Sequence, residues 1–409
     1  MEKHDNQNSV SLRTFDTGAA LLPIMGVIFV AFLVIGLAMP VLPLHVHARL
    51  GFGTFAVGVV AGIQFSAALV SRPWAGHYAD RWGAKRAVVV GVFAAAASGL
   101  LYLLSLHFLD APGMSVVILC LGRALLGGAE SVIITGGVSW GLALVRPQST
   151  GKVIAWIGAS MFGAFAIGAP LGSALYAVYG FVAIAGATTL APLVTLLLMS
   201  PIPAVMPLAQ VGRPSFTKVI GVIWGPGLGS GLSSVGFGAI TAFVVLLFAQ
   251  HGWSHGWLAY SAFATVFILA RLVFGHLPDK IGGARVALAC VLIEAAGQAL
   301  IWLAQRPEIA LVGAALSGLG YSLIYPGLGI EAVRRVPPQS RGLAMGAYTA
   351  FLDVALGFGT PALGLIAGGA GLGAVFLVST LAALGSAAVA ITLLRPRSTG
   401  PACSLTPVA

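Results

Sequence analysis

The amino-acid sequence predicts an all-α membrane protein of twelve transmembrane helices, arranged in two pseudo-symmetric lobes of six. Three observations lead to this prediction: long apolar runs recur along the chain, basic residues gather in alternate loops, and the second half repeats motifs of the first. Of the 409 residues, 58% are hydrophobic and 8% are charged. Because a soluble domain carries about 25% charged residues, most of this protein must face lipid.

The apolar runs define the individual spans, since a transmembrane helix needs about 20 predominantly apolar residues. The first run is too long for the core of a signal peptide, so we expect it to remain as a span. Only Tyr179-Gly180 marks the boundary between the fifth and sixth spans. The expected spans are 21–44, 55–77, 86–106, 114–144, 151–179, 181–200, 219–249, 256–277, 285–304, 308–333, 341–368 and 372–394.

A Pro-rich segment between the sixth and seventh spans divides the chain into its two halves. The expected organisation is an N-terminal tail at 1–20, a first lobe at 21–200, a linker at 201–218, a second lobe at 219–394 and a C-terminal tail at 395–409. The two tails and the linker are expected on the same side of the membrane, because an even number of spans separates them.

Lys and Arg concentrate in the loops that follow even-numbered spans, whereas the other loops carry Arg49 and Arg306. Cytoplasmic loops of membrane proteins carry this excess, so we expect both termini in the cytoplasm of a bacterial inner-membrane protein. The net charge of +10 then reflects topology, and nucleic-acid binding is not favoured. The basic loop residues are Arg81, Lys85, Arg86, Arg146, Lys152, Arg213, Lys218, Lys280, Arg285, Arg334, Arg335 and Arg341.

Several chemistries are not supported by any motif. Cys120, Cys290 and Cys403 lack the spacing of a zinc site or a disulfide framework. A nucleotide-binding loop of the Gly-x4-Gly-Lys type is missing, so direct use of ATP is not expected. The deep carboxylates lie on separate helices without a matching base, which argues against a membrane enzyme. We expect no cofactor, no metal ion and a monomeric chain.

The two halves contain copies of the same motifs. The pattern Arg-x3-Gly-His-x2-Asp-(Arg/Lys)-x-Gly occurs at 72–83 and again at 271–282, a shift of 199. A second motif at 145–151 returns at 336–342, a shift of 191. Parallel repeats of this kind place a two-fold axis along the membrane normal and a substrate site between the halves. The duplication therefore favours a two-lobed transporter over a membrane enzyme or a sensor.

The first copy of the loop motif, Gly76-x3-Asp80-Arg81-x-Gly83-x-Lys85-Arg86, resembles the signature of the major facilitator superfamily, and the resemblance covers essentially the whole chain. The segments Pro-Val-Leu-Pro-Leu at 40–44 and Ala-Lys-Arg at 84–86 are similar to the YhhS/YfcJ-like group of bacterial transporters. That resemblance implies the major facilitator fold and efflux of sugars or small metabolites.

The resemblance further implies that the loop motif and its repeat form a cytoplasmic gate that latches the two lobes. We expect Gly76 to let the second and eleventh helices approach closely, and Glu331 to act as a gate partner of Asp279. The alternative is that the basic loops only set the topology. The gate residues are Gly76, Asp80, Arg81, Gly83, Lys85, Arg86, Asp279, Lys280, Glu331, Arg334 and Arg335.

Arg123 and Glu130 lie deep in the fourth span, where an ionisable group is costly unless it faces a cavity or a partner. Their spacing of seven residues puts both on one face. We expect Glu130 to carry a proton under the influence of Arg123; a static ion pair with a neighbouring helix is the alternative. Asp353 is a second candidate for binding protons or substrate; the alternatives are that it caps the local kink in its helix or pairs across helices. Glu294 is expected to be a structural acid.

Polar and aromatic side chains within the spans are candidates for lining the central cavity: Gln64, Trp140, Trp156, Tyr321, Tyr325 and Tyr348. Tyr321 and Tyr325 are the strongest pair, because residues four apart share a helix face. Arg72 and Arg271 are expected to extend to the membrane interface.

Gly163, Gly168, Pro170 and Gly172 in the fifth span resemble the antiporter signature of exporters, which implies a hinge. Pro361 repeats the feature in the eleventh span, so a purely structural bend is the alternative. The sequence thus favours proton-coupled efflux of a sugar, metabolite or drug-like solute by alternating access, with proton-coupled uptake as the alternative. The expected partners are this solute, protons and membrane lipid.

Overall fold

The computed structural model describes residues 17–144, 150–204, 216–337 and 341–394. Within these ranges the chain forms helices and no strands, and twelve helices are long and apolar enough to cross a membrane. The predicted fold class is therefore confirmed. The expected tails at 1–20 and 395–409, the linker at 201–218 and the motif at 145–151 lie wholly or largely outside the described residues.

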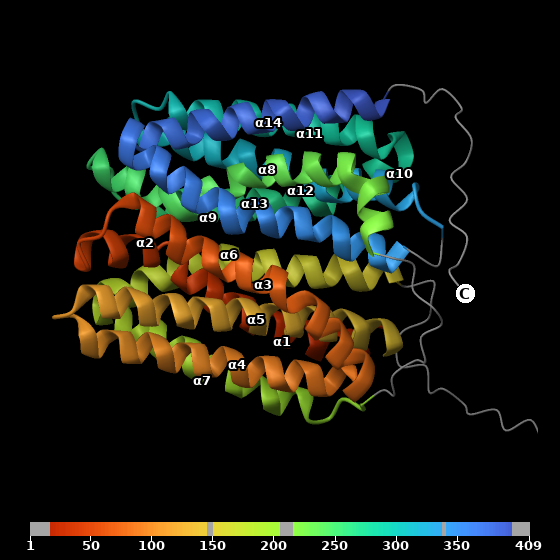
Figure 1. Cartoon of the computed structure of the whole chain (residues 1–409), viewed down its shortest axis with the longest axis horizontal. Helices are drawn as coiled ribbons and strands as arrows, with labels where there is room; N and C mark the ends of the chain where they lie inside the picture. Colours follow the sequence, from red (N-terminus) through yellow and green to blue (C-terminus); the bar gives the residue numbers. More distant parts are fainter. Residues whose placement is uncertain (1–16, 145–149, 205–215, 338–340, 395–409) are drawn as a thin grey trace, which may run out of the picture.

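The long helices form two bundles that lie side by side (Figure 1). The N-terminal lobe contains α1 (Thr17–Ala38), α3 (Thr54–Trp82), α4 (Ala84–Ser105), α5 (Pro112–Leu144), α6 (Thr150–Tyr179) and α7 (Phe181–Met199), with the short α2 (Leu42–Leu44), η1 (His45–Arg49) and η2 (Leu106–Phe108). The C-terminal lobe contains α8 (Phe216–Gln250), α9 (Trp257–Phe274), α10 (Leu277–Ile281), α11 (Gly283–Trp302), α12 (Pro307–Val333), α13 (Arg341–Ala370) and α14 (Leu372–Leu394).

Two predicted boundaries can be checked directly. The first span does not end at residue 44: α1 stops at Ala38, and after a turn α2 and the π-helical η1 continue it to Arg49. Pro43 at the start of α2 is tolerated there because the first turn of a helix has no use for its missing N–H. The boundary after Tyr179 is confirmed, since Gly180 separates α6 from α7 with a φ of +69° that favours glycine.

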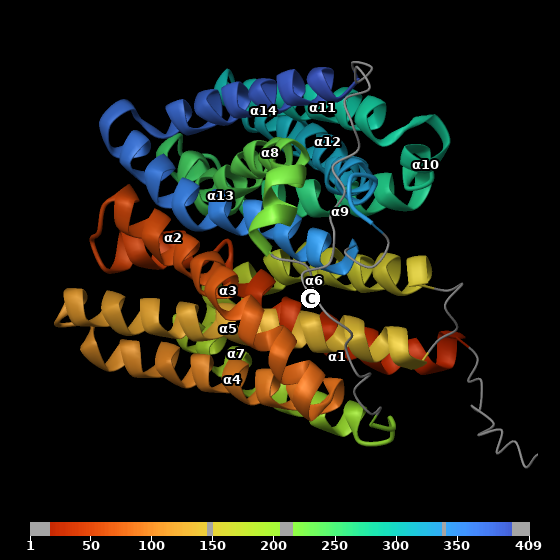
Figure 2. The same ribbon diagram turned by 45° about the vertical axis from the view of Figure 1, so that its right-hand side comes forward.

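The lobes meet along two helix pairs, α3 with α13 and α6 with α9 (Figure 2). We call the end of the bundle that carries the basic loops the basic end, and the opposite end the far end. In the far-end half of the interface, Gly58 and Gly62 of α3 lie against the backbone of Thr360 and the ring of Pro361 on α13. Thr54 Oγ1 donates a hydrogen bond of 2.8 Å to the Gly364 carbonyl. The lobes are therefore closed at the far end.

The basic end of the same helix pair is different. A Cβ added at Gly76 would meet no atom of the described residues within 4 Å. The second and eleventh helices thus make no close approach at Gly76 in this conformation, and such an approach when the basic end closes stays a prediction. Gly58 and Gly62, about five and four helical turns toward the far end, make a close approach to α13 here, since lack of a side chain allows helix backbones to touch.

The sequence duplication is visible in the packing inside each lobe. Gly127 on α5 lies against the Gln64 backbone on α3, and Gly318 on α12 lies against the Phe263 backbone on α9. Gly127 and Gly318 are 191 residues apart in the sequence, and Gln64 and Phe263 are 199 residues apart. These are the same shifts that relate the repeated sequence motifs. The two lobes therefore bury equivalent contacts at equivalent positions.

Candidate functional site

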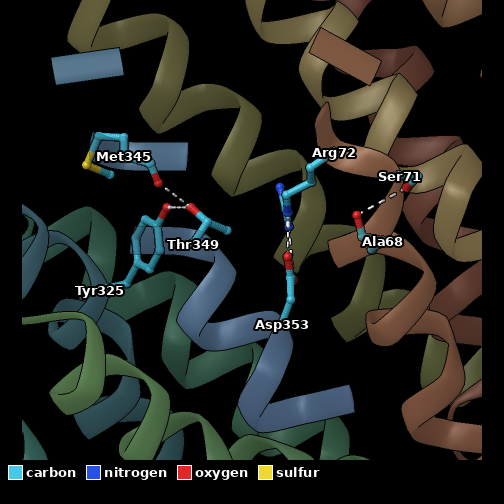
Figure 3. A network of polar contacts seen from close by, with 7 residues as sticks. All are labelled: Ala68, Ser71, Arg72, Tyr325, Met345, Thr349 and Asp353. Atoms are coloured by element: carbon cyan, nitrogen blue, oxygen red, sulfur yellow. Dashed lines mark hydrogen bonds and ion pairs between the residues drawn. The ribbon is translucent and has the colours of Figure 1, made fainter. Parts of the chain in front are cut away.

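An ion pair joins the two lobes near the middle of the α3–α13 contact. Arg72 on α3 points toward Asp353 on α13 (Figure 3), and its Nη2 donates to Asp353 Oδ1 at 3.0 Å. Arg72 Nε donates to the other carboxylate oxygen, so the pair is bidentate. The side chain of Asp353 is 2% exposed and that of Arg72 is 25% exposed. Such charge-assisted pairs are strong and geometrically specific.

This pair corrects the prediction for Arg72, which does not extend to the membrane interface. A guanidinium within the span can lower its desolvation cost by binding a carboxylate of the opposing helix, and Asp353 lies within reach because α3 and α13 pack together. Asp353 makes the pairing across helices that was one alternative to a proton or substrate role, and that role stays a prediction. The partner was not predictable from the sequence, because 281 residues separate the two side chains.

A second carboxylate lies close to this pair on the N-lobe side. Gln64 Nε2 on α3 donates to Glu130 Oε2 on α5 at 2.6 Å. Gln64 is 1% exposed, and its Oε1 has no hydrogen-bond partner among the described residues. Glu130 also interacts electrostatically with Arg72 and Asp353. The structure thus brings Gln64, Glu130 and Asp353 together, with one carboxylate bound to a neutral amide and the other to a cation.

Arg123 shares the α3-facing side of α5 with Glu130 but makes its own contacts. It is 2% exposed, and its Nε donates to the Val60 carbonyl at 3.3 Å. Its Nη1 lacks a hydrogen-bond partner within the described part of the chain. Together with Val60, Phe65 and Thr241 it lines a small pocket. Arg123 therefore acts on Glu130 through space and not through an ion pair.

Aromatic side chains dominate the corresponding wall of the C-terminal lobe. The Tyr321 hydroxyl lies 3.1 Å from Ser234 Oγ, and the Tyr321 ring stacks on Phe237 with centroids 5.5 Å apart. The Tyr325 hydroxyl lies 2.7 Å from Thr349 Oγ1 (Figure 3). Tyr348 is fully buried and donates to the Tyr325 carbonyl at 3.0 Å. In this conformation Tyr348 is part of the lobe core.

Arg271, the repeat equivalent of Arg72, lies at the second contact between the lobes. Its Cζ lies 5.8 Å from the centroid of Phe267, and 4.0 Å from the position of a Cβ added at Gly158 on α6. The Phe267 ring stacks on Phe162 of α6 with centroids 3.6 Å apart. Arg271 also interacts electrostatically with Tyr325. Arg271 therefore points toward the opposite lobe and not along the expected path to the membrane interface.

The two tryptophans predicted to line the cavity lie toward the basic end. Trp140 is fully buried, and its Nε1 donates to the Pro203 carbonyl at 3.0 Å. Lys85 Nζ lies 5.7 Å from the Trp140 ring centroid and donates to the Ile202 carbonyl at 2.6 Å. These contacts tie α4, α5 and the end of α7 together inside one lobe. Trp156 on α6 is 39% exposed.

The gate residues cluster at the basic end, as their loop positions require. Gly83 and its repeat Gly282 have φ values of +94° and +100°, which lets α4 and α11 begin directly after a sharp turn. Glu331 pairs with Arg334 at 3.6 Å, and its Oε1 lies 3.4 Å from a Cβ added at Gly283. Its nearest contacts are therefore within the lobe, whereas Asp279 is exposed. The role of the remaining members, Asp80, Arg81, Lys85, Arg86, Lys280 and Arg335, as a latch stays a prediction.

The glycines of the predicted hinge pack α6 against α1. Gly168 lies against the backbone of Gly36, and Gly172 lies against the Leu37 carbonyl. A Cβ at Gly163 would lie 3.9 Å from Phe29. Pro170 lies inside α6, which continues through it. The segment thus makes a close helix contact, and its action as a hinge stays a prediction.

Two six-helix lobes that meet at a charged interface define a secondary transporter of the alternating-access class. The family model described as Major Facilitator Superfamily matches residues 24–260 and 227–405. The chain therefore belongs to the major facilitator superfamily, which confirms the predicted family; the YhhS/YfcJ-like subgroup stays a prediction. It is a multi-pass membrane transporter and not an enzyme.

Relatives and solved structures agree with this assignment. The chain is 41% identical to an uncharacterized MFS-type transporter of Salmonella typhimurium over 389 residues, which cover 95% of this chain and 98% of the relative. It is 41% identical to another from Burkholderia pseudomallei over 387 residues, covering 93% of each. The crystal structure of a D-xylose-proton symporter has a TM-score of 0.73 at 13% identity, covering 95% of this chain and 100% of that one.

Proposed function

We propose that the protein exports a small organic solute across the bacterial inner membrane in exchange for protons. The excess of Lys and Arg at the basic end supports a cytoplasmic location for that end and for both termini. The far-end contacts at Gly58, Gly62 and Thr54 then close the outer side of the interface. Transport requires the lobes to rock so that this side opens and the basic end closes.

The ion pair between Arg72 and Asp353 carries the proposal. Opening the outer side parts α3 from α13, so this pair must break in every cycle. Arg72 stabilises the charged form of Asp353, and a proton on the carboxylate removes that charge attraction. A proton taken up outside, while the pair is broken, is therefore released inside when the pair forms again. Proton entry and lobe movement are coupled in this way.

Glu130 supports a second protonation step. The buried Oε1 of Gln64 lacks a donor among the described residues, and leaving such an acceptor unsatisfied costs about 1–3 kcal/mol. Gln64 already donates to Glu130 through its Nε2. A proton on Glu130 would supply the missing donor to Oε1, as in a paired carboxylic acid and amide. In the ionised state the Glu130 carboxylate keeps the bond from Gln64 and has further lone pairs that can accept from water or a solute group.

The direction of solute movement rests on the antiporter-like segment of α6. Its glycines hold α6 tightly against α1, which suits a segment that seals the central path against proton leakage. A symporter that imports the solute uses the same ion pair with the opposite solute direction. The sign of solute-driven proton movement separates the two mechanisms.

We would reconstitute the full chain into liposomes that contain a pH-sensitive dye and add an aldopentose, benzoate or a cationic dye outside. Exchange predicts that entry of the transported solute makes the lumen more alkaline, while symport makes it more acidic. Glu130→Gln and Asp353→Asn should abolish solute-driven proton movement, and Arg285→Gln, an exposed charge change at the start of α11, should retain it. Solute flux without any proton movement in the wild-type chain would refute the coupling.

A further inference from the structure

The duplication equips the two lobes with equivalent arginines, and they are paired differently. Arg72 and Arg271 correspond at the shift of 199, and each reaches from its own lobe toward the other. Pro170 and Pro361 set the shift of 191 between α6 and α13, so the counterpart of Asp353 is Phe162. One arginine therefore faces a carboxylate, whereas the other faces an aromatic ring.

The surroundings of Arg271 leave its charge without an acidic partner. Among the described residues no carboxylate lies within 4.0 Å of its guanidinium, and its nearest described contacts are the Phe267 ring and Gly158. Tyr321 and Tyr325 act on it only through space. A cation–π contact recovers only part of the free energy that an ion loses when water is removed from around it, and Arg271 is partly buried. Arg271 thus keeps an unused capacity for a bidentate anion.

The space beside Arg271 has the features of an anion site rather than of a second internal ion pair. Gly158 presents bare backbone toward the guanidinium from α6. Phe162 and Phe267 stack across the interface and supply a flat apolar surface next to the charge. Asp353 is already bound to Arg72, and Glu130 is held by Gln64. A solute that brings a carboxylate would complete at Arg271 the arrangement that Asp353 completes at Arg72.

We propose that Arg271 binds the anionic group of the transported solute, and that this solute is a small organic carboxylate. The proposal rests on the proposed function in one respect, namely that the solute passes between the lobes. Arg271 is the specificity-determining group, because a planar guanidinium matches a carboxylate with two parallel hydrogen bonds. The stacked rings of Phe162 and Phe267 accept the apolar part of the solute when the lobes move.

The test measures binding to the purified full chain in detergent by thermal unfolding. Two matched sets keep the body of the probe constant and change its charge: benzoate, benzamide and benzylamine, and lactate with lactamide. We expect a carboxylate to raise the unfolding temperature while its neutral amide and the amine do not. Loss of a charge-assisted contact should weaken binding by about tenfold or more in Arg271→Gln, with partial recovery in Arg271→Lys.

Phe162→Asp is a second variant that should lose carboxylate binding while the protein stays folded. It places a carboxylate where the first repeat predicts one, so it should pair with Arg271, preserve or raise the unfolding temperature and abolish carboxylate binding. Arg285→Gln serves as the control for removal of a positive charge elsewhere in the same lobe. Retention of carboxylate binding in both Arg271→Gln and Phe162→Asp would overturn the proposal. Stabilisation by the amides or the amine, or by no probe at all, would also overturn it.

Because this assay uses no proton gradient, its outcome is independent of proton coupling. Carboxylate binding that depends on Arg271 can be present in a chain that moves no protons. Conversely, movement of a sugar in one direction with protons in the other would support the exchange mechanism and contradict the carboxylate site.

Discussion

The central walls of the two lobes have the same backbone packing but opposite chemistry. Gly127 and Gly318 bring equivalent helix pairs into contact in the N- and C-terminal lobes. At the shifts that relate these contacts, Gln64 and Glu130 of the first lobe correspond to Phe263 and Tyr321 of the second. The N-terminal wall is therefore charged and hydrogen-bonded. The C-terminal wall is aromatic, and the ring centroids of Phe263 and Tyr321 lie 6.1 Å apart.

This difference shows which features of a duplicated transporter are constrained. Close helix contact in lipid depends on small residues, so a glycine at the crossing point cannot change in either copy. The side chains that face the other lobe are constrained only by what passes between them. One copy carries the ionisable and amide groups to which we assign proton binding, and the other presents an arginine on an aromatic surface.

Adding a side chain at each glycine crossing point tests whether the two lobes depend on the same close helix contact. Gly127→Val and Gly318→Val would both push a Cβ into a backbone carbonyl, and overpacking costs about 1–3 kcal/mol. We expect losses near the upper end, because backbone cannot move aside like a side chain. Thermal unfolding in detergent measures the effect. Gly128→Val, with no described atom within 4 Å of its Cβ, should be tolerated, and equal damage there would contradict this explanation.

The role of the charged N-terminal wall is tested by removing the carboxylate that pairs with Arg72. Asp353→Asn should cost about 1–3 kcal/mol, less than the 3–5 kcal/mol of a fully buried pair, because Arg72 is 25% exposed. The far-end closure should also weaken. A disulfide between Thr54→Cys and Gly368→Cys reports that closure, since a Cβ at Gly368 lies 3.3 Å from Thr54 Oγ1. Undiminished cross-linking in Asp353→Asn would show that the pair does not hold the lobes together.

The smallest expected effect is at Trp140, and it distinguishes residues that face the other lobe from residues that only pack inside one lobe. Trp140→Phe removes the indole donor to Pro203, and a lost hydrogen bond of this kind costs about 1 kcal/mol. We expect a slightly lower unfolding temperature with unchanged solute affinity and unchanged pH dependence. A change in solute selectivity would instead return Trp140 to the cavity, where the sequence had suggested it.

Much of the fold follows from local sequence patterns. Apolar runs of sufficient length give the spans, because a backbone in lipid must satisfy its own hydrogen bonds. Turns such as the one at Gly180 are visible because a positive φ favours glycine. The sequence singled out Gln64, Glu130 and Asp353, and the structure joins Gln64 to Glu130 with Asp353 acting on Glu130 through space; the roles of these residues stay predictions. Arg72 and Arg271 were misjudged, since a long basic side chain inside a span can reach the membrane surface or a partner equally well.

The sequence by itself determined that this is a duplicated twelve-helix transporter of the major facilitator superfamily, and which ionisable groups lie deep within its spans. The tertiary structure decided which of those groups meet. Helix periodicity gives the face of a side chain but not the neighbour of that face, and the neighbour depends on how helices hundreds of residues apart are packed. For this reason Arg72 pairs with Asp353, whereas Arg271 lies beside the Phe267 ring and near Gly158 of the other lobe. The difference between those contacts is a property of the assembled lobes.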